Sequence, residues 1–405
     1  MTTTPADSLR QRLAALTPGS ARFAIEAVDL LLAEARAAGA SDLHIQPTAD
    51  GLEARWRIDG VLHPAVLLPA SVAPNVVARL KVLADLLTYR SDVPQEGRIR
   101  GVPGEVEMRV STFPTLHGEK AVVRLFAEPG RYLRLDDLGL PPEIRDALRG
   151  WLGATSGAVV LSGPAGSGKT TTIYACLREL VATSQGQRSL ATLEDPIEAA
   201  VPGVSQSQVN PTAGFTLEAG LRSLLRQDPE VIVVGEIRDR HTAETAFQAS
   251  LTGHLVLTTF HAGSAAGVLG RLADMGIEPY LLRSGLLAVI SQRLVRRLCP
   301  ECSRPITDPL ERLGLKVDEA RSAAGCESCG GTGYRGRIVL AEMLTPDASG
   351  VGDAVLSRAD VGRIERAAIA AGMVTRWDRA RRAVEEGRTS PAEVRRVLGV
   401  GESTS

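Results

Sequence analysis

The segment Val159-Val160-Leu161-Ser162-Gly163-Pro164-Ala165-Gly166-Ser167-Gly168-Lys169-Thr170-Thr171 decides the fold of the larger part of this chain. It holds the pattern G-x-x-x-x-G-K-[ST] between a short apolar run and a helical pattern over residues 171–183. Glycines at this spacing let backbone N–H groups turn toward phosphate oxygens, and the lysine adds a positive charge. The N-terminus of the following helix favours the same anions. A chance match in a glycine-rich loop is the alternative, and the strand–loop–helix context argues against it.

This loop predicts a site for ATP and Mg²⁺. The hydroxyl of Thr170 suits Mg²⁺, and Lys169 is one of only four lysines among 46 basic residues. The residues that we expect to bind the nucleotide are Gly163, Pro164, Ala165, Gly166, Ser167, Gly168, Lys169, Thr170 and Thr171.

Short apolar runs alternate with helical patterns on both sides of the loop. The runs are Gly157–Ser162, Ser189–Glu194, Val231–Gly235 and Leu255–Thr259. Parallel strands buried on both faces have this composition, because helices cover each face of the sheet. The alternation predicts an α/β fold with a doubly wound sheet, a RecA-like P-loop ATPase core over residues 129–280.

The rest of the chain divides around this core. Residues 1–20 are polar and are expected to be flexible, and residues 21–128 mix helical and strand patterns, as in a small α+β domain. Glu128-Pro129-Gly130 breaks the pattern and marks a linker. Residues 281–405 are expected to be mostly helical, with a subdomain around the cysteine pairs.

Polar residues after three of the apolar runs are candidates for catalysis. An ATPase needs a group that orients the attacking water and a ligand for Mg²⁺. Glu194 ends the second run, Glu236 follows the third, and His261 follows the fourth. In a doubly wound sheet these strand ends face the ligand. The alternatives are solvated surface acids, a helix cap in the case of the neighbouring Asp195, and a structural or solvent-exposed histidine.

Four of the five cysteines form a C-x₂-C…x₂₃…C-x₂-C pattern: Cys299, Cys302, Cys326 and Cys329. Paired thiolates at this spacing suit a structural, tetrahedral Zn²⁺ site, and four reduced cysteines without metal are the alternative. The fifth, Cys176, is expected to be a core residue.

The bulk properties limit the partners. The net charge of -1 argues against a strong nucleic-acid binder, which needs a surplus of Lys and Arg. No segment approaches the roughly 18 consecutive apolar residues of a membrane-spanning helix, and residues 1–22 lack the apolar stretch of a signal peptide. We therefore expect a cytoplasmic protein.

Together and in this order, the motifs resemble the secretion and pilus assembly ATPases: the type II secretion ATPase (protein E) and the type IV pilus extension ATPase. The resemblance runs from about Ala21 to Leu398 and includes the loop and the cysteine pairs. The other matching segments are Gly39–Pro47 (with Gln46 for the usual Glu), Arg57–Gly60, Pro94–Arg98, Arg109–Thr112, Gly118–Lys120, Thr192–Glu198, Arg222–Glu230, Gly235–Asp239 and Thr252–His261.

The resemblance implies a homo-hexameric motor at the inner membrane that hydrolyses ATP to drive pilin or pseudopilin assembly. It implies an inner-membrane platform protein as partner and a membrane-anchored recruiting protein, although only about twenty residues precede the first matching helix. It also implies arginines around the nucleotide. The catalytic candidates are Arg222 and Arg226, and the nucleotide-binding candidates are Arg98, Arg109 and Arg337.

Three other functions stay open at this point. A pilus retraction ATPase belongs to the same superfamily but generally lacks the cysteine pairs. A nucleic-acid translocase on a RecA-like core is disfavoured by the net charge. A scaffold ring that binds ATP without hydrolysing it is disfavoured because the catalytic motifs are present. The sequence does not distinguish secretion from pilus extension or DNA uptake.

Overall fold

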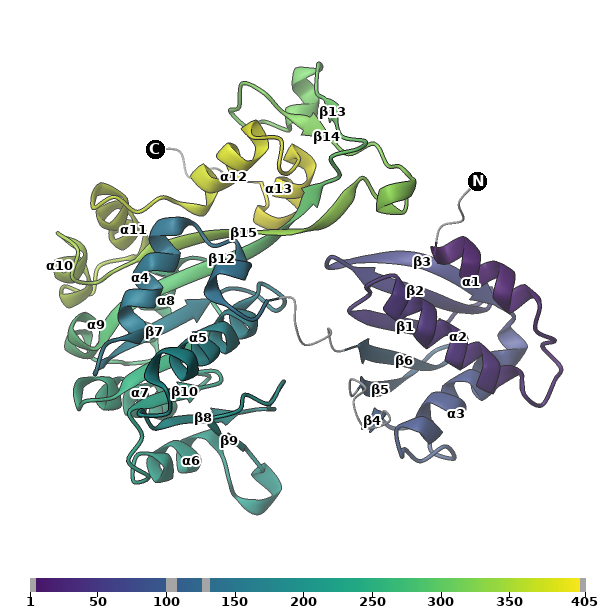
Figure 1. Cartoon of the computed structure of the whole chain (residues 1–405), viewed down its shortest axis with the longest axis horizontal. Coiled ribbons are helices and arrows are strands. Elements are labelled where there is room, and N and C mark those ends of the chain that lie inside the picture. Colours follow the sequence, from purple (N-terminus) through teal and green to yellow (C-terminus); the bar gives the residue numbers. More distant parts are fainter. Residues whose placement is uncertain (1–4, 100–107, 126–131, 401–405) are drawn as a thin grey trace. The chain divides into compact units, whose positions relative to one another are not determined.

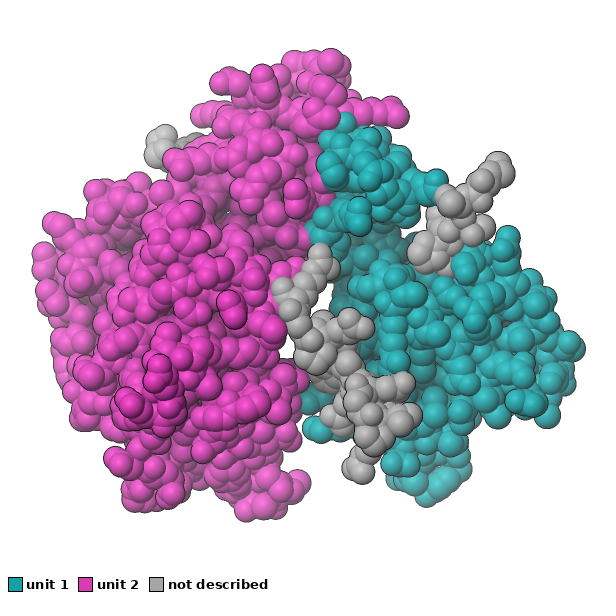
Figure 2. Space-filling model, in the orientation of Figure 1, with its two compact units in different colours: residues 1–129, 299–303, 323–336 teal, residues 130–298, 304–322, 337–405 magenta. Residues whose placement is uncertain are grey.

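The computed structural model of this chain describes residues 5–99, 108–125 and 132–400, which form two compact units (Figure 2). Unit 1 comprises residues 1–129, 299–303 and 323–336, and unit 2 comprises the rest of the chain. No helix in the described ranges is both long enough and apolar enough to cross a membrane.

Unit 1 is built on a six-stranded sheet with the order β3-β2-β1-β6-β5-β4, in which neighbouring strands run antiparallel. Three helices pack against it (Figure 1). The strands are β1 (Asp42–Pro47), β2 (Leu52–Ile58), β3 (Val61–Leu68), β4 (Gln95–Ile99), β5 (Met108–Thr115) and β6 (Gly118–Leu125). The helices are α1 (Pro5–Ala14), α2 (Phe23–Ala37) and α3 (Ala73–Leu83).

Local sequence explains two features of unit 1. Asp59 and Gly60 both have positive φ, at 48° and 82°, which is the backbone of the tight turn that joins β2 to β3. Helix α1 occupies residues that we expected to be flexible. Its Leu9 and Leu13, four residues apart, lie on one helical face and are buried in the core, which gives the segment a reason to be ordered.

Unit 2 holds a seven-stranded sheet with the order β15-β12-β7-β11-β10-β8-β9. The pairs from β12 through β7, β11, β10 and β8 to β9 are parallel. The strands are β7 (Gly157–Ser162), β8 (Leu190–Glu194), β9 (Ser205–Gln208), β10 (Val231–Val234), β11 (Leu255–Phe260), β12 (Leu286–Leu298) and β15 (Tyr334–Leu344). The two-stranded sheet β13 (Arg304–Pro305) and β14 (Arg321–Ser322) is separate.

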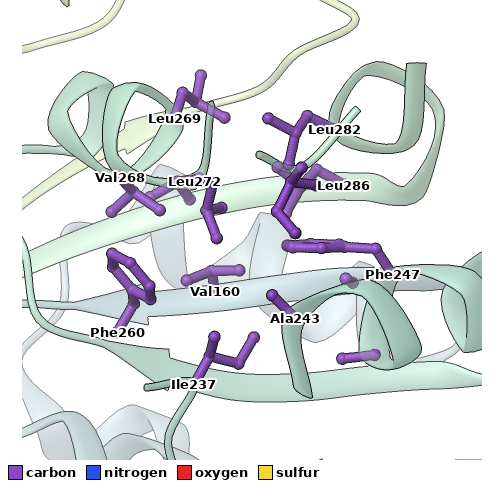
Figure 3. Packing of buried hydrophobic residues seen from close by; sticks show 14 of the residues in the cluster. Val160, Ile237, Ala243, Phe247, Phe260, Val268, Leu269, Leu272, Leu282 and Leu286 are labelled. Atoms are coloured by element: carbon purple, nitrogen blue, oxygen red, sulfur yellow. The ribbon is translucent and has the colours of Figure 1, made fainter. Parts of the chain in front are cut away.

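Helices cover both faces of this sheet, so that neighbouring residues of one strand belong to different cores. Ala158 and Val160 lie in the core shown in Figure 3, while Val159 and Leu161 lie in the core with α5. The helices are α4 (Pro142–Leu152), α5 (Lys169–Ser184), α6 (Leu217–Leu224), α7 (Arg240–Leu251), α8 (Ala265–Asp274), α9 (Pro279–Gly285), α10 (Val351–Leu356), α11 (Val361–Ala370), α12 (Arg376–Glu385) and α13 (Pro391–Leu398). Short 3₁₀ helices occur at Ala70–Val72, Leu135–Leu138, Pro211–Ala213, Pro309–Arg312 and Glu327–Cys329.

We expected residues 281–405 to be mostly helical. This prediction is wrong for two segments, which form the long strands β12 and β15. The first residues of β12, Leu286 to Ile290, extend the central sheet beside β7, where most of their side chains are buried. A short apolar run is compatible with either a buried strand or a buried helix, and periodicity does not separate the two. Pairing with β7, about 130 residues earlier in the chain, is what makes this run a strand and not a helix.

Candidate nucleotide site and cysteine cluster

The loop 163–168 joins the buried strand β7 to helix α5, which begins at Lys169. Gly163 has φ +147°, and a Cβ there would lie 2.5 Å from both Gln292 O and Ser167 Oγ. Gly166 and Gly168 also have positive φ, at 74° and 94°. Only glycine adopts these conformations at low cost, which explains the spacing of glycines in the sequence. The hydroxyl-bearing residues after the lysine, Thr170 and Thr171, are exposed.

Lys169 is buried within the loop that it follows. Its Nζ donates hydrogen bonds to the carbonyl oxygens of Gly163, at 2.8 Å, and of Pro164, at 3.1 Å. Burial lowers the pKa of Lys169; the negative charge of Glu236 opposes this, and the positive charge of Arg293 adds to it. The loop itself lies at the end of β11, because the N–H of Gly163 donates to the carbonyl oxygen of Phe260 at 3.3 Å.

Glu236 and His261 are brought together at the ends of β10 and β11. Glu236 Oε1 lies 3.3 Å from His261 Nε2, and Oε2 lies 3.2 Å from a guanidinium nitrogen of Arg238. Arg238 also lies 3.4 Å from the carboxylate of Asp195, which follows β8. Arg238 therefore links the ends of two strands and is a residue that the sequence reasoning did not single out.

Glu194 occupies a different environment. Its side chain is buried at the end of β8 and accepts hydrogen bonds from Tyr174 Oη (2.5 Å), Thr192 Oγ1 (2.6 Å) and Gln206 Nε2 (3.2 Å). Tyr174 lies on α5, and its oxygen accepts from the backbone N–H groups of Glu198 and Ala199. The carboxylate therefore connects the loop helix to the segment after β8. No sequence motif pointed to Tyr174, because the contact spans 20 residues.

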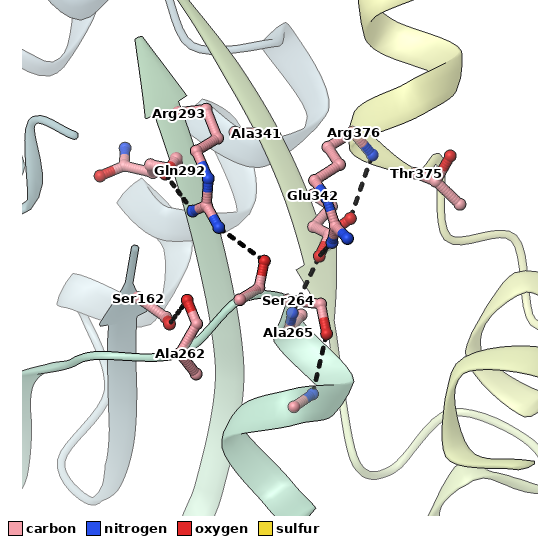
Figure 4. A network of polar contacts seen from close by, with 12 residues as sticks. Ser162, Ala262, Ser264, Ala265, Gln292, Arg293, Ala341, Glu342, Thr375 and Arg376 are labelled. Carbon is pink, nitrogen blue, oxygen red and sulfur yellow. Dashed lines mark hydrogen bonds and ion pairs between the residues drawn. The ribbon is translucent and has the colours of Figure 1, made fainter. Parts of the chain in front are cut away.

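A second polar network holds the segment after His261 (Figure 4). Arg293 is buried and donates to the carbonyl oxygens of Gly263, at 2.7 Å, and of Gln292, at 2.9 Å. Glu342 is also buried and accepts from the backbone N–H of Ala265 and from Arg376. Arg293 and Glu342 lie on β12 and β15, the two strands that the sequence did not predict. The contacts that hold Gly263 and Ala265 were therefore not predicted either.

The candidate arginines lie on several elements. Arg222 pairs with Glu218 of its own helix at 2.8 Å, and Arg226 donates to Ser223 Oγ at 3.2 Å. Arg98 on β4 lies directly opposite Arg109 on β5 in the strand register. Arg337 is an exposed residue of β15.

The four cysteine sulfurs all lie within 4.8 Å of one another. Three of the separations are 3.8 Å (Cys299–Cys326), 3.9 Å (Cys302–Cys329) and 3.8 Å (Cys326–Cys329). Four sulfurs at about 2.3 Å from Zn²⁺ in a tetrahedron would be about 3.8 Å apart, so the cluster fits that ion.

The surroundings of Cys329 also suit a metal ligand. Burial raises the pKa of its thiol, but backbone N–H groups of Cys326 and Gly333, at 3.2 and 3.1 Å from Sγ, outweigh this and lower it to about 7. N–H donors of this kind stabilise a thiolate, which is the form that binds metal. Cys176, in contrast, is buried in the core with α5, as expected.

A glycine loop at the end of a central parallel strand, beside the strand ends that carry Glu236 and His261, defines a P-loop nucleotide-binding protein. The chain belongs to the family described as Type II/IV secretion system protein, whose model matches residues 19–396. This confirms the family suggested by the sequence motifs.

Curated relatives are similar over most of this chain. The type II secretion system ATPase E of Vibrio cholerae is 44% identical over 331 residues, covering 80% of this chain and 65% of the relative. The type IV pilus assembly ATPase PilB of Thermus thermophilus is 41% identical over 330 residues, covering 79% of this chain and 37% of the relative. The chain therefore spans less than two thirds of the length of these two relatives.

Solved structures share the fold. The ATPase DotB of Legionella pneumophila has a TM-score of 0.64 at 24% identity, covering 90% of this chain and 93% of that one. The pilus retraction motor PilT with bound ADP has a TM-score of 0.53 at 24% identity, covering 85% and 93%. These structures confirm the predicted α/β class.

Proposed function

We propose that this protein is an ATP-hydrolysing motor that powers pilin or pseudopilin assembly in a type II secretion or type IV pilus system. The observation that carries the proposal is that the loop, Glu236 and His261 lie at neighbouring strand ends. Glu236 and His261 are 3.3 Å apart, and the N–H of Gly163 donates to the carbonyl oxygen of Phe260, the residue before His261, at 3.3 Å. The relatives named as a secretion ATPase and a pilus assembly ATPase support the choice of system.

In this proposal the loop residues bind the phosphates of ATP, and Thr170 binds Mg²⁺, which supplies charge neutralisation for phosphoryl transfer. Glu236 orients the attacking water. His261, 3.3 Å away, holds the Glu236 carboxylate in place, and Arg238 holds its other oxygen. Phosphoryl transfer depends mainly on such positioning and on electrostatics.

Glu194 fits a positioning role better than the direct catalytic role expected from the sequence. Its two oxygens already accept three hydrogen bonds, out of about four that a carboxylate accepts. We propose that it fixes α5 against the end of β8, which keeps the loop helix in register with the catalytic strand ends.

The proposed assembly follows the family resemblance. It is a cytoplasmic homo-hexamer held at the inner membrane by a platform protein, with a structural Zn²⁺ on Cys299, Cys302, Cys326 and Cys329. Arg222, Arg226, Arg98, Arg109 and Arg337 supply positive charge to the nucleotide in the ring. Nucleic acid is not an expected partner.

The test replaces the loop lysine and the catalytic carboxylate. Lys169→Ala and Glu236→Gln are expected to abolish ATP hydrolysis, and both are expected to abolish pilus assembly or secretion in cells that depend on this protein. Lys316→Ala, which removes an exposed lysine outside the loop, is the matched control and keeps both activities. Normal assembly or secretion with Lys169→Ala would rule out the motor. Stimulation of hydrolysis by single-stranded DNA would point instead to a nucleic-acid translocase.

A further inference from the structure

Unit 1 contains a lysine that no site described so far uses. Lys81 on α3 has 0% of its surface exposed. Its Nζ donates to both carboxylate oxygens of Glu119 on β6, each at 2.9 Å, and to the carbonyl oxygen of Arg90 at 2.6 Å. An ammonium group has three donors, and each has an acceptor here. A buried ion pair of this kind contributes little net stability, so its role is to be found in the segments that it holds together.

The pair fixes the segment that leads into the edge strand β4. The Arg90 carbonyl, held by Lys81, also accepts from Gln95 Nε2 at 2.7 Å. Gln95 is the first residue of β4, and its side-chain amide additionally binds both the N–H and the C=O of Leu87, at 2.9 and 3.1 Å. One side chain thus ties the start of β4 to two points of the preceding segment, and Lys81 ties that segment to α3 and β6.

A close backbone approach reinforces this attachment. A Cβ added to Gly97 in β4 would clash with the backbone oxygen of Ala84 and would lie 2.8 Å from Leu86 Cδ2. Glycine at position 97 therefore lets β4 pack directly on the segment after α3. Gln95, Gly97 and Glu119 belong to the motifs 94–98 and 118–120, for which the sequence alone offers no physical reason.

We infer that Lys81, Glu119 and Gln95 are positioning residues that set the place of β4, and with it Arg98. Within the described sheet, β4 is an edge strand that pairs only with β5, where Arg98 lies opposite Arg109. An edge strand with one partner frays easily, and fraying would separate the two guanidinium groups. The functional consequence rests on the proposed role of these arginines at the nucleotide; the structural consequence does not.

The test removes the ion pair without leaving a buried charge. In Lys81→Met/Glu119→Met both groups are replaced by apolar side chains of similar size, a change that buried pairs often tolerate. The Arg90 carbonyl keeps its bond from Gln95. Gln95→Leu removes the side-chain hydrogen bonds that join the start of β4 to Leu87 and Arg90. Leu9→Ala is the matched control, because Leu9 is fully buried in α1, which contacts the opposite edge strand β3.

The first measurement is hydrogen exchange of the full-length protein, compared between residues 95–99 and residues 52–58 of the same sheet. Lys81→Met/Glu119→Met and Gln95→Leu are both expected to speed hydrogen exchange of residues 95–99 by about tenfold or more, while residues 52–58 keep their exchange rate. Leu9→Ala is not expected to show this selectivity. Unchanged exchange of 95–99 in both variants would overturn the inference, whatever the fate of the proposed motor function.

The second measurement is ATP hydrolysis at saturating ATP. The same two variants, Lys81→Met/Glu119→Met and Gln95→Leu, are expected to lower kcat by about tenfold or more, in line with the cost of misplacing a charged group. In the Arg98→Ala background they are expected to add no further loss, because they act through Arg98. A full additional loss in that background would overturn the inference. The motor proposal is judged separately, by Lys169→Ala.

Discussion

The hydroxyl of Tyr174 is a single group whose removal has several effects in unit 2. In Tyr174→Phe, Glu194 loses one of its three donors, and the N–H groups of Glu198 and Ala199 lose their acceptor. A hydrogen bond to a charged group contributes about 1.5–3 kcal/mol, and each neutral one contributes about 1 kcal/mol. With water replacing part of these contacts, we expect helix α5 to be destabilised by about 3 kcal/mol at pH 8.

The destabilisation of α5 by Tyr174→Phe is expected to depend on pH, because the hydroxyl that the substitution removes is titratable. Burial first, and the bond and charge of Glu194 second, raise the pKa of Tyr174 from 10.0 to about 12. A raised pKa of an acid means that its stabilisation is complete below the unfolded pKa of about 10 and disappears as the pH rises toward 12. Between pH 8 and pH 11 the wild type therefore loses about 1.4 kcal/mol that Tyr174→Phe cannot lose. The difference between the two proteins is expected to fall from about 3 to about 1.6 kcal/mol.

The reporter for this experiment is Cys176, which lies two residues away on α5 and is only 1% exposed. Modification of its thiol in the native protein requires the helix to open. The labelling rate relative to that of the urea-unfolded chain gives the opening free energy. Mass spectrometry of the peptide that carries Cys176 separates it from the four clustered cysteines. Tyr280→Phe is the control, because Tyr280 is 56% exposed.

Two results would refute this reasoning. Equal labelling of Cys176 in wild type and Tyr174→Phe at pH 8 would mean that the hydroxyl does not stabilise α5. An equal difference at pH 8 and pH 11 would mean that Tyr174 titrates near its ordinary pKa in the folded protein.

Three further predictions concern other parts of the site. Gly163→Ala is expected to weaken ATP-analogue binding by at least a hundredfold in a calorimetric titration, because its Cβ would meet Gln292 O at 2.5 Å; Gly186→Ala, also at positive φ but with open space around it, should bind normally. Glu342→Gln is expected to cost about 3 kcal/mol in urea unfolding, because it removes the buried charge that pairs with the partly buried Arg376; a loss below 1 kcal/mol would contradict this. Cys329→Ser is expected to reduce zinc, measured by elemental analysis, from one ion per chain to a small fraction, whereas Cys176→Ala should keep it.

The sequence was sufficient for the parts of the fold that local pattern determines. Four strands of the central sheet, β7, β8, β10 and β11, were predicted because each is a run of buried apolar residues near a motif. The turn at Asp59-Gly60 also follows from local sequence, because few residues other than these adopt positive φ readily.

What the sequence could not supply are contacts between distant segments. β12 belongs to the sheet because its first residues pair with β7, and Glu194 is occupied because Tyr174 reaches it from another element. Neither relation leaves a periodic signal. Lys81 illustrates the same limit, since a lysine on a helix is expected at the surface until its acceptors are known.

The scarcity of lysine gives this protein an unusual chemical surface. Lys81 and Lys169 are buried, Lys120 is partly buried and Lys316 is exposed, so amine-directed reagents meet few targets in the folded chain. Among the lysines, a mild acylating reagent should therefore mark Lys316 first, and modification of Lys169 would report opening of the phosphate loop. Protection of that one amine by ATP would give a footprint of nucleotide occupancy with little background.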